Sequence, residues 1–383
     1  MYFQQFIHFF DKNIKYKLYL CSRNYYKPME DQKVIISQQL EETLKKAVAT
    51  CERDRLFILV DENTSRLCLP LISTMDCMQG AQVITIGATD ENKTLQTLTK
   101  VWQALQQGGA TRHSLMVNLG GGMVTDLGGF AAATFKRGMN YINIPTTLLA
   151  MVDASVGGKT GINFGGLKNE IGVFSNASSV ILDTTFLMTL DHENQLSGYA
   201  EMLKHGLISD EQHWADILEN LENLEKLEKP ENLEKLSALL ARSVAVKQRI
   251  VREDPTERGL RKALNLGHTV GHAFESLALQ RKPILHGYAV AYGLICELYL
   301  SAIKTGFPVD KMRQTVTAIR ENYGQMTITC NDYPTLLAMM THDKKNVAGE
   351  INFTLLGDIG DIRINQTATK EEIMEALDFY REG

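Results

Sequence analysis

Short apolar runs alternate with amphipathic stretches through the first half of this chain of 383 residues. The runs with the length of strands are LFILV (56–60), QVITIG (82–87), SLMVNLGGG (114–122) and YINIP (141–145). The stretches with helical spacing between them are 38–52, 93–107 and 126–137. Strands that alternate with helices in this way form a mostly parallel sheet with helices on its faces. The pattern predicts an N-terminal α/β domain with a Rossmann-like parallel sheet.

The second half of the chain has helical periodicity from Asp191 almost to its end. The stretch 218–236 contains NLEKL twice, and its Pro230 separates two amphipathic helices with solvated, charged faces. Residues 351–364 predict a late β-hairpin before a final helix. Because the chain is too long for one ordinary core, we expect two domains, α/β over 29–190 and mainly α-helical over 191–383. Residues 1–28 are expected to be an extension outside the fold, with Met29 as an alternative start.

Composition excludes several classes of function. A net charge of −5 gives no basic field for nucleic acid or an anionic membrane, so an anionic substrate needs a local cluster of Lys and Arg. No apolar run reaches membrane-spanning length, and the best stretch, 288–303, contains Glu297. The six cysteines form no CxxC pair, as expected of reduced thiols. We therefore expect a cytoplasmic protein with no nucleic-acid or membrane partner.

A glycine-rich turn, LGGGMVTDLGGF (119–130), follows one predicted strand and leads into a helix. Such glycines let the backbone approach a pyrophosphate at the helix N-terminus, although packing alone also favours glycine there. The segment VDENT (60–64) ends another strand with Asp61 and Asn63, which suit a ribose or an adenine edge, or alternatively cap a helix. Because ligands of open α/β sheets bind at the carboxyl ends of strands, both segments together predict a nucleotide site.

Segment 145–174 is dense in small and polar residues and is expected to be tightly packed backbone. Asp153, Lys159, Lys168 and Asn169 interrupt it. Charged side chains are rarely buried unless they are paired or used, so these residues predict a site for an anionic, hydroxylated ligand. A solvated loop is the alternative interpretation.

Potential metal ligands occur in three helical segments. Glu201 and Lys204 lie on one face of the helix predicted for YAEMLKHGLI (199–208), where a surface ion pair is the default interpretation. His268 and His272 share a face of the helix predicted for LRKALNLGHTVGHAFES (260–276), and His286 lies at an element boundary. Two histidines and a carboxylate form the ligand set of a catalytic zinc, cobalt or iron ion. The spacing leaves both His268 and His272 as candidate ligands.

The same segment, 260–276, places Arg261 and Asn265 in helical register above the two histidines. The default interpretation of Arg261 is a surface residue at a helix start, held by Glu253 or Glu257.

Six blocks of the chain resemble the dehydroquinate synthase family, in that family's order, from about Gln32 to the C-terminus. They are GGGMVTDLGGFAAATFKRG, IPTTLLAMVDASVGGKTGIN, LKNEIG, GYAEMLKHG, LRKALNLGHTVGHAFE and ILHG. The resemblance implies a carbon–oxygen lyase of the shikimate pathway, which requires NAD and one divalent metal, zinc or cobalt. The implied reaction converts 3-deoxy-D-arabino-heptulosonate 7-phosphate to 3-dehydroquinate and phosphate by transient oxidation, phosphate elimination, re-reduction and intramolecular aldol closure. A homodimer is also implied, with Arg137 reaching into the neighbour's site.

Carried over residue by residue, the family's functional positions fall into three groups. The metal ligands are Glu201, His268 and His286, which frees His272 for the substrate. The NAD contacts are Asp61, Asn63, Lys93, Gly120, Gly121, Gly122, Asp126, Thr146, Thr147, Lys168 and Thr189. The substrate contacts are Arg137, Asp153, Lys159, Asn169, Lys204, Lys247, Arg261, Asn265, His272 and either Lys344 or Lys345.

Within the substrate group, the resemblance assigns the phosphate to four residues and the carboxylate to two. The phosphate residues are Lys159, Asn169, Asn265 and His272. Lys247 and Arg261 bind the carboxylate, for which a guanidinium is favoured because it binds both oxygens at once.

This sequence departs from the family pattern at three points. Tyr288 replaces the usual Glu after the HG of the last metal block, Asp90 replaces the usual Glu three residues before Lys93, and the N-terminal extension has no counterpart. None of these departures removes a proposed ligand, but the first changes the surroundings of His286.

Three other functions have different requirements. The substrate of a related cyclase that makes a cyclitol precursor has no carboxylate, so such an enzyme would not need Lys247 and Arg261 to bind one. A metal-dependent polyol dehydrogenase does not need Lys159, Lys168 and Asn169 to bind a phosphate. An inactive nucleotide-binding regulator does not need the three metal ligands.

Overall fold

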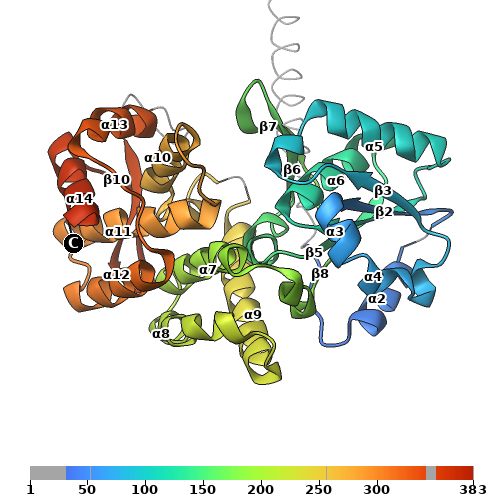
Figure 1. Ribbon diagram of the computed structural model, residues 1–383, viewed down its shortest axis with the longest axis horizontal. Helices are drawn as coiled ribbons and strands as arrows, with labels where there is room; N and C mark the ends of the chain where they lie inside the picture. The colour runs from blue at the N-terminus through green and yellow to red at the C-terminus, as the bar shows by residue number, and fades with distance from the viewer. Residues whose placement is uncertain (1–31, 52, 256, 342–350, 383) are drawn as a thin grey trace, which may run out of the picture.

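The computed structural model describes residues 32–382 except 52, 256 and 342–350. The extension 1–28, Met29, Lys344 and Lys345 therefore lie outside the described residues. Two lobes are visible, with the sheet in one and most of the later helices in the other (Figure 1). None of the described helices combines the length and apolar character needed to cross a membrane.

In the part of the chain that the structure describes, six strands form a parallel sheet, which confirms the predicted α/β domain. From one edge to the other they are β1 (Val34–Ile36), β8 (Ser179–Leu182), β5 (Asn140–Pro145), β4 (Leu115–Gly120), β2 (Leu56–Asp61) and β3 (Gln82–Ile86). Every residue of β2 and β4 is buried, which explains why both strands are predominantly apolar. The polar residue inside β4, Asn118, donates to the side chain of Asn143 on β5. The four predicted strands agree with β2 to β5 within two residues.

Helices connect these strands and cover the sheet (Figure 1). They are α2 (Leu40–Ala49), α3 (Glu62–Leu67), α4 (Pro70–Ser73), α5 (Leu95–Gln107) and α6 (Gly122–Thr134). The chain leaves β2 toward β3 at one side and leaves β4 toward β5 at the other. The carboxyl ends of β2 and β4 therefore flank the point at which an open α/β sheet binds its ligand.

A β-hairpin projects from the sheet lobe and was not predicted. Its strands, β6 (Lys159–Phe164) and β7 (Leu167–Phe174), pair antiparallel. Every residue of β7 is exposed. The expectation of tightly packed backbone is therefore wrong for β7, because β7 is the exposed strand of the hairpin, whereas Thr160, Gly161 and Ile162 of β6 are buried.

The second lobe is mainly helical, as predicted. Its helices are α7 (His192–Leu207), α8 (Glu211–Asn220), α9 (Pro230–Glu253), α10 (His268–Leu279), α11 (His286–Thr305), α12 (Val309–Tyr323), α13 (Tyr333–Thr341) and α14 (Lys370–Glu382). Pro230 begins α9, where its missing N–H leaves no helical hydrogen bond unmade. The predicted late hairpin is β9 (Asn352–Asp358) with β10 (Asp361–Thr367).

Two glycines let three helices approach closely enough to share a site. A Cβ added at Gly287 of α11 would lie 1.8 Å from the carbonyl oxygen of Ser197 on α7. A Cβ added at Gly293 would lie 2.0 Å from the carbonyl oxygen of Gly267, which precedes α10. Any side chain at these positions would push α7 or α10 away from α11.

Candidate active site

Glu201 on α7, His268 at the start of α10 and His286 at the start of α11 converge at one point. Oε1 of Glu201 lies 3.3 Å from Nε2 of His268 and 3.5 Å from Nε2 of His286. One potential ligand atom from each residue lies within 4.8 Å of the others. The structure thus brings together the three residues that the family resemblance implies as metal ligands, although their backbones come from three separate helices.

The two imidazole rings are oriented by acceptors on their outer sides. Nδ1 of His268 lies 3.0 Å from the carbonyl oxygen of Leu266, and Nδ1 of His286 lies 3.2 Å from a carboxylate oxygen of Glu275. The oxygen acceptor at each Nδ1 directs Nε2 of both rings toward Glu201, so Nε2 is the nitrogen at which a metal ion would bind in place of a proton.

The charges at this point suit a cation. Burial disfavours the imidazolium of His286, but the carboxylates of Glu201 and Glu275 outweigh it and raise the pKa of His286 to about 10. Burial lowers the pKa of His268 to about 4, so the cluster stabilises one positive charge. Oε1 of Glu201 is buried and has no well-aligned hydrogen bond among the described residues. Two imidazole nitrogens and a carboxylate with a free oxygen fit a zinc or cobalt ion.

Glu201 also pairs with Lys204, one turn further along α7. Both side chains are buried, so the surface ion pair suggested by their spacing is wrong. Burial disfavours the Glu201 carboxylate, but the ammonium of Lys204 and the imidazoles of His268 and His286 together outweigh it and hold the pKa of Glu201 well below its usual value. Removing either partner would leave a buried charge without compensation.

A second acidic cluster beside the first does not suit a cation. Ligand atoms of Asp153, Glu201 and His205 also lie within 4.8 Å of one another. However, Lys204 already donates to Glu201, and Lys247 donates to the side chain and the carbonyl of Asp153. With two ammonium groups on its carboxylates, this cluster is electrostatically satisfied.

His268 is fixed by a buried carboxylate that the sequence did not single out as functional. Gly267 precedes α10 with φ +78°, and the carboxylate of Glu297 on α11 accepts hydrogen bonds from the backbone N–H groups of Gly267, Thr269 and Val270. These are N–H groups that a helix start leaves without partners. Because Gly267 interrupts the helix, the predicted register of Arg261 and Asn265 above the histidines is wrong, and both lie in a 3-10 turn, Leu260–Asn265.

Arg261 and Lys247 are both buried, which excludes the interpretation of Arg261 as a surface residue. Nη1 of Arg261 donates to the carbonyl of Pro255 at 2.9 Å. Burial disfavours the carboxylate of Asp153, but Lys247 outweighs that effect and lowers the pKa of Asp153. These two cations and one carboxylate therefore lie close to the metal-ligand cluster, since Asp153 also neighbours Glu201.

Glu257 links two of the predicted phosphate contacts, Lys159 and Asn265. The sequence suggested Glu257 only as a surface partner of Arg261. Its carboxylate accepts from Lys159 at 2.9 Å and from Asn265 at 3.2 Å. Burial disfavours this carboxylate, but Lys159 outweighs it and lowers the pKa of Glu257. His272, also predicted to contact phosphate, lies with its ring centroid 5.4 Å from that of His268.

The predicted nucleotide contacts gather at the carboxyl ends of the strands. Gly120 ends β4, Gly121 caps α6, and an added Cβ at Gly121 would lie 3.1 Å from Thr147. Lys93 donates to Asp126 of α6 at 2.6 Å and to Asn169 of β7 at 2.5 Å. Four more are Gly122 at the start of α6, Thr146 directly after β5, Asn63 in α3, and Thr189, whose Oγ1 lies 3.6 Å from Sγ of Cys68. Lys168 differs, because it lies on β7 of the hairpin and pairs with Glu275 at 2.8 Å.

Asp61 caps a helix, which was the alternative to a nucleotide contact that its position allowed. It caps α3, with its carboxylate accepting from the backbone N–H of Thr64 at 2.8 Å. This capping box fixes the carboxylate at the end of β2, directly at the edge where the glycine turn of β4 lies.

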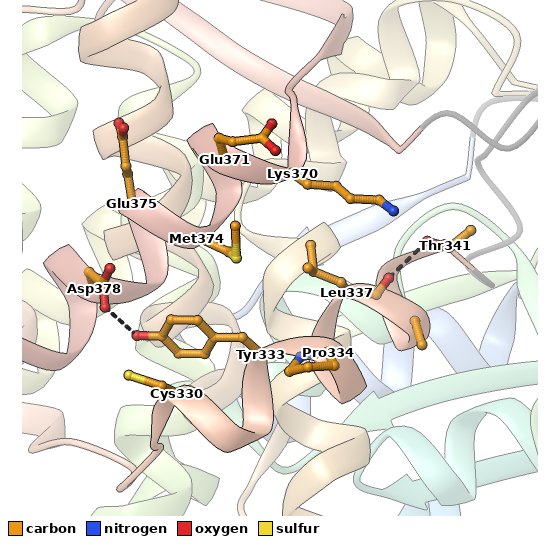
Figure 2. Close-up of a pocket in the computed structure, with 11 residues that line it drawn as sticks. Cys330, Tyr333, Pro334, Leu337, Thr341, Lys370, Glu371, Met374, Glu375 and Asp378 are labelled. Carbon is orange, nitrogen blue, oxygen red and sulfur yellow. Dashed lines mark hydrogen bonds between the residues drawn. The ribbon is translucent and has the colours of Figure 1, made fainter.

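Not every predicted residue lies in this cleft. Arg137 lines a separate hollow of about 710 Å³ with Arg112, His113 and Phe174, and no described contact joins it to the metal ligands. Another hollow of about 790 Å³ lies between α13 and α14, with Tyr333, Leu337 and Met374 on its walls (Figure 2). None of the described residues predicted for the site lines this second hollow.

Comparison with known proteins agrees with this geometry. Residues 83–197 match the family described as 3-dehydroquinate synthase N-terminal, and residues 198–346 match 3-dehydroquinate synthase C-terminal. The 3-dehydroquinate synthase of Parabacteroides distasonis is 54% identical over 93% of this chain and 99% of its own length. That of Clostridium tetani is 34% identical over 95% of this chain and 92% of its own length.

Among solved structures, the 2-epi-5-epi-valiolone synthase of Streptomyces hygroscopicus with bound NAD+ and Zn2+ superposes with a TM-score of 0.82 at 25% identity. The superposition covers 93% of this chain and 98% of that one. Both halves of the chain match the same family, and the relatives extend over nearly its full length. The chain belongs to the 3-dehydroquinate synthase family.

Proposed function

We propose that the protein converts 3-deoxy-D-arabino-heptulosonate 7-phosphate to 3-dehydroquinate and phosphate in the cytoplasm, as a carbon–oxygen lyase. Membership of the family supports this activity. The observation that carries the proposal is the convergence of Glu201, His268 and His286 beside buried cations. When bound, NAD would supply reversible hydride transfer, and the divalent ion would act as a Lewis acid on the substrate's hydroxyl groups.

The chain's own residues would bind and orient the substrate. Lys159, Asn169, Asn265 and His272 would hold the phosphate, with Glu257 keeping Lys159 and Asn265 together. Lys247 and Arg261 would hold the carboxylate at the buried end of the site, where charge-assisted hydrogen bonds are strongest. Lys204 and Asp153 would contact the hydroxyl groups nearest the metal ligands, and Lys344 or Lys345 would add a contact from outside the described residues.

Arg261 provides the test of this substrate class. Arg261→Lys keeps the charge but loses the planar fork, so kcat/KM for the heptulosonate phosphate should fall about tenfold or more, because a charge-assisted hydrogen bond contributes roughly 1.5–3 kcal/mol. The assay is phosphate release by wild type and variant, with and without the substrate's carboxylate. On an analogue without the carboxylate, a poor substrate already, the variant should lose little more.

Equal losses on both substrates would mean that Arg261 supports the fold or binds the phosphate. The case against a cyclitol-forming cyclase would then fail. Faster turnover of the analogue than of the heptulosonate phosphate by wild type would contradict the proposed substrate directly.

The proposed homodimer is supported by an exposed apolar patch beside Arg137. The patch consists of hairpin side chains that are between 38% and 57% exposed: Phe164, Leu167, Ile171, Val173 and Phe174. Phe174 lines the same hollow as Arg137. Contiguous exposed apolar side chains of this kind are typical of a protein interface, and an arginine at its edge can reach a neighbour's site.

Phe174→Asp tests this interface, because it places an unpaired charge in the patch. Wild type should sediment as a dimer, and the variant should be mainly monomeric at the same concentration, with an unchanged circular dichroism spectrum. A monomeric wild type, or a variant that stays dimeric, would contradict this interface.

A further inference from the structure

Glu275 lies outside every set of functional residues predicted from the sequence, yet it contacts two of them. It belongs to α10, seven residues after His268 on the same helical face. Its side chain is only 12% exposed. One carboxylate oxygen lies 3.2 Å from Nδ1 of His286, and the other accepts from Nζ of Lys168 at 2.8 Å.

Toward the metal-ligand cluster, Glu275 determines which nitrogen of His286 carries the proton. A carboxylate at Nδ1 accepts only, so Nδ1 carries a proton and Nε2, which faces Glu201, is left as the nitrogen that would bind an ion. Carboxylates in this position orient a ligating histidine, and removing one typically lowers metal affinity by about 10- to 100-fold.

Toward the sheet lobe, Glu275 holds the β6–β7 hairpin through Lys168. The next hairpin residue, Asn169, accepts from Lys93, and Lys93 donates to Asp126 of α6. The contacts therefore run without a gap from His286 to the glycine turn at which α6 begins. In Figure 1, α10 lies in the helical lobe and β6 and β7 lie in the lobe of the sheet, so the contact between Glu275 and Lys168 joins the two lobes.

We propose that Glu275 is a positioning residue that couples the metal-ligand cluster to the nucleotide end of the cleft. This coupling rests on the proposed function, which identifies the two ligands as a divalent ion and NAD. A bound ion fixes the His286 ring against Glu275, which fixes Lys168 and the hairpin in the place that nucleotide binding requires. Because coupling between two sites is reciprocal, NAD must tighten metal binding by the same factor by which metal tightens NAD binding.

The test is a pair of titrations on the full chain. Co2+ is titrated by its visible absorption with and without NAD, and NAD is titrated by calorimetry with and without Zn2+ or Co2+. In wild type, each ligand should tighten the other by about fivefold or more. Glu275→Gln should weaken Co2+ binding by about 10- to 100-fold and reduce the coupling factor to about one.

Two further variants separate orientation from coupling. In the absence of NAD, Lys168→Met should bind Co2+ with an affinity within about threefold of wild type. Its coupling factor, which is the ratio of Co2+ affinities with and without NAD, should nevertheless fall to about one. As a matched control, Glu372→Gln removes a carboxylate that pairs with Lys304 in the same lobe and should leave both affinities and the coupling unchanged. Equal melting temperatures of Glu275→Gln and Glu372→Gln would exclude a folding defect.

The outcomes distinguish this inference from the proposed function. If wild type binds Co2+ and NAD independently, or if Glu275→Gln keeps the coupling, the inference is wrong while the function stands. If wild type binds neither ligand, the proposed function fails first.

Discussion

Glu201→Ala should abolish turnover and empty the metal site. Glu201 is the only carboxylate in the described cluster with His268 and His286, and its loss also leaves the buried ammonium of Lys204 without its partner. A Lewis-acid metal stabilises the transition state by several kcal/mol, so kcat should fall by about three orders of magnitude or more. The unpaired Lys204 should lower the free energy of unfolding by about 3–5 kcal/mol.

Metal content by mass spectrometry, turnover and denaturant unfolding measure the three effects. His272→Ala is the matched comparison, because its ring lies beside the cluster but is expected to contact the substrate: it should retain the metal and lose turnover. An alanine variant of Glu201 that keeps its metal, or a His272 variant that loses it, would show that the ligand set is wrong.

Gly287→Ala should separate α7 from α11 and weaken metal binding without touching a ligand. The new methyl group would lie 1.8 Å from a backbone oxygen that has no rotamer to change, so the helices must move apart by more than an ångström. Overpacking of this kind costs about 1–3 kcal/mol or more, which lowers Tm by several degrees. Because His286 adjoins Gly287, we expect Co2+ affinity to fall at least tenfold.

Ala302→Gly on the same helix is the control for stability alone. It should lower the free energy of unfolding by about 1 kcal/mol through helix propensity and leave Co2+ affinity unchanged. Equal Co2+ affinities of Gly287→Ala and wild type would contradict the role assigned to this close approach.

Much of the fold could be predicted because burial leaves a strong pattern in the sequence. β2 and β4 are buried on both faces, so each is a predominantly apolar run that ends at a carboxylate or a glycine. The β6–β7 hairpin left no such pattern, since the apolar residues of β7 are exposed and are interrupted by Lys168, Asn169 and Glu170. The local pattern therefore resembled a packed loop.

The site could be predicted in part, and its gaps have a common physical reason. Spacing placed Glu201 and Lys204 on one helical face, but it could not indicate that the face is buried. Glu257, Glu275 and Glu297 act through contacts with residues in other elements, which no local spacing encodes. The break at Gly267 was missed because a single glycine inside a helical pattern does not by itself indicate where a helix is interrupted.

Multiple turnovers on a single bound NAD would test most directly whether the cleft performs a closed redox cycle. Zinc-loaded protein with one NAD per site and no free nucleotide is mixed with excess heptulosonate phosphate, and phosphate and reduced nicotinamide are followed together. Phosphate should be released in many-fold excess over NAD, with formation of the cyclic product and no accumulation of NADH. If release instead stops at one phosphate per NAD, or if NADH accumulates with each product, the protein is a dehydrogenase and not a cyclase.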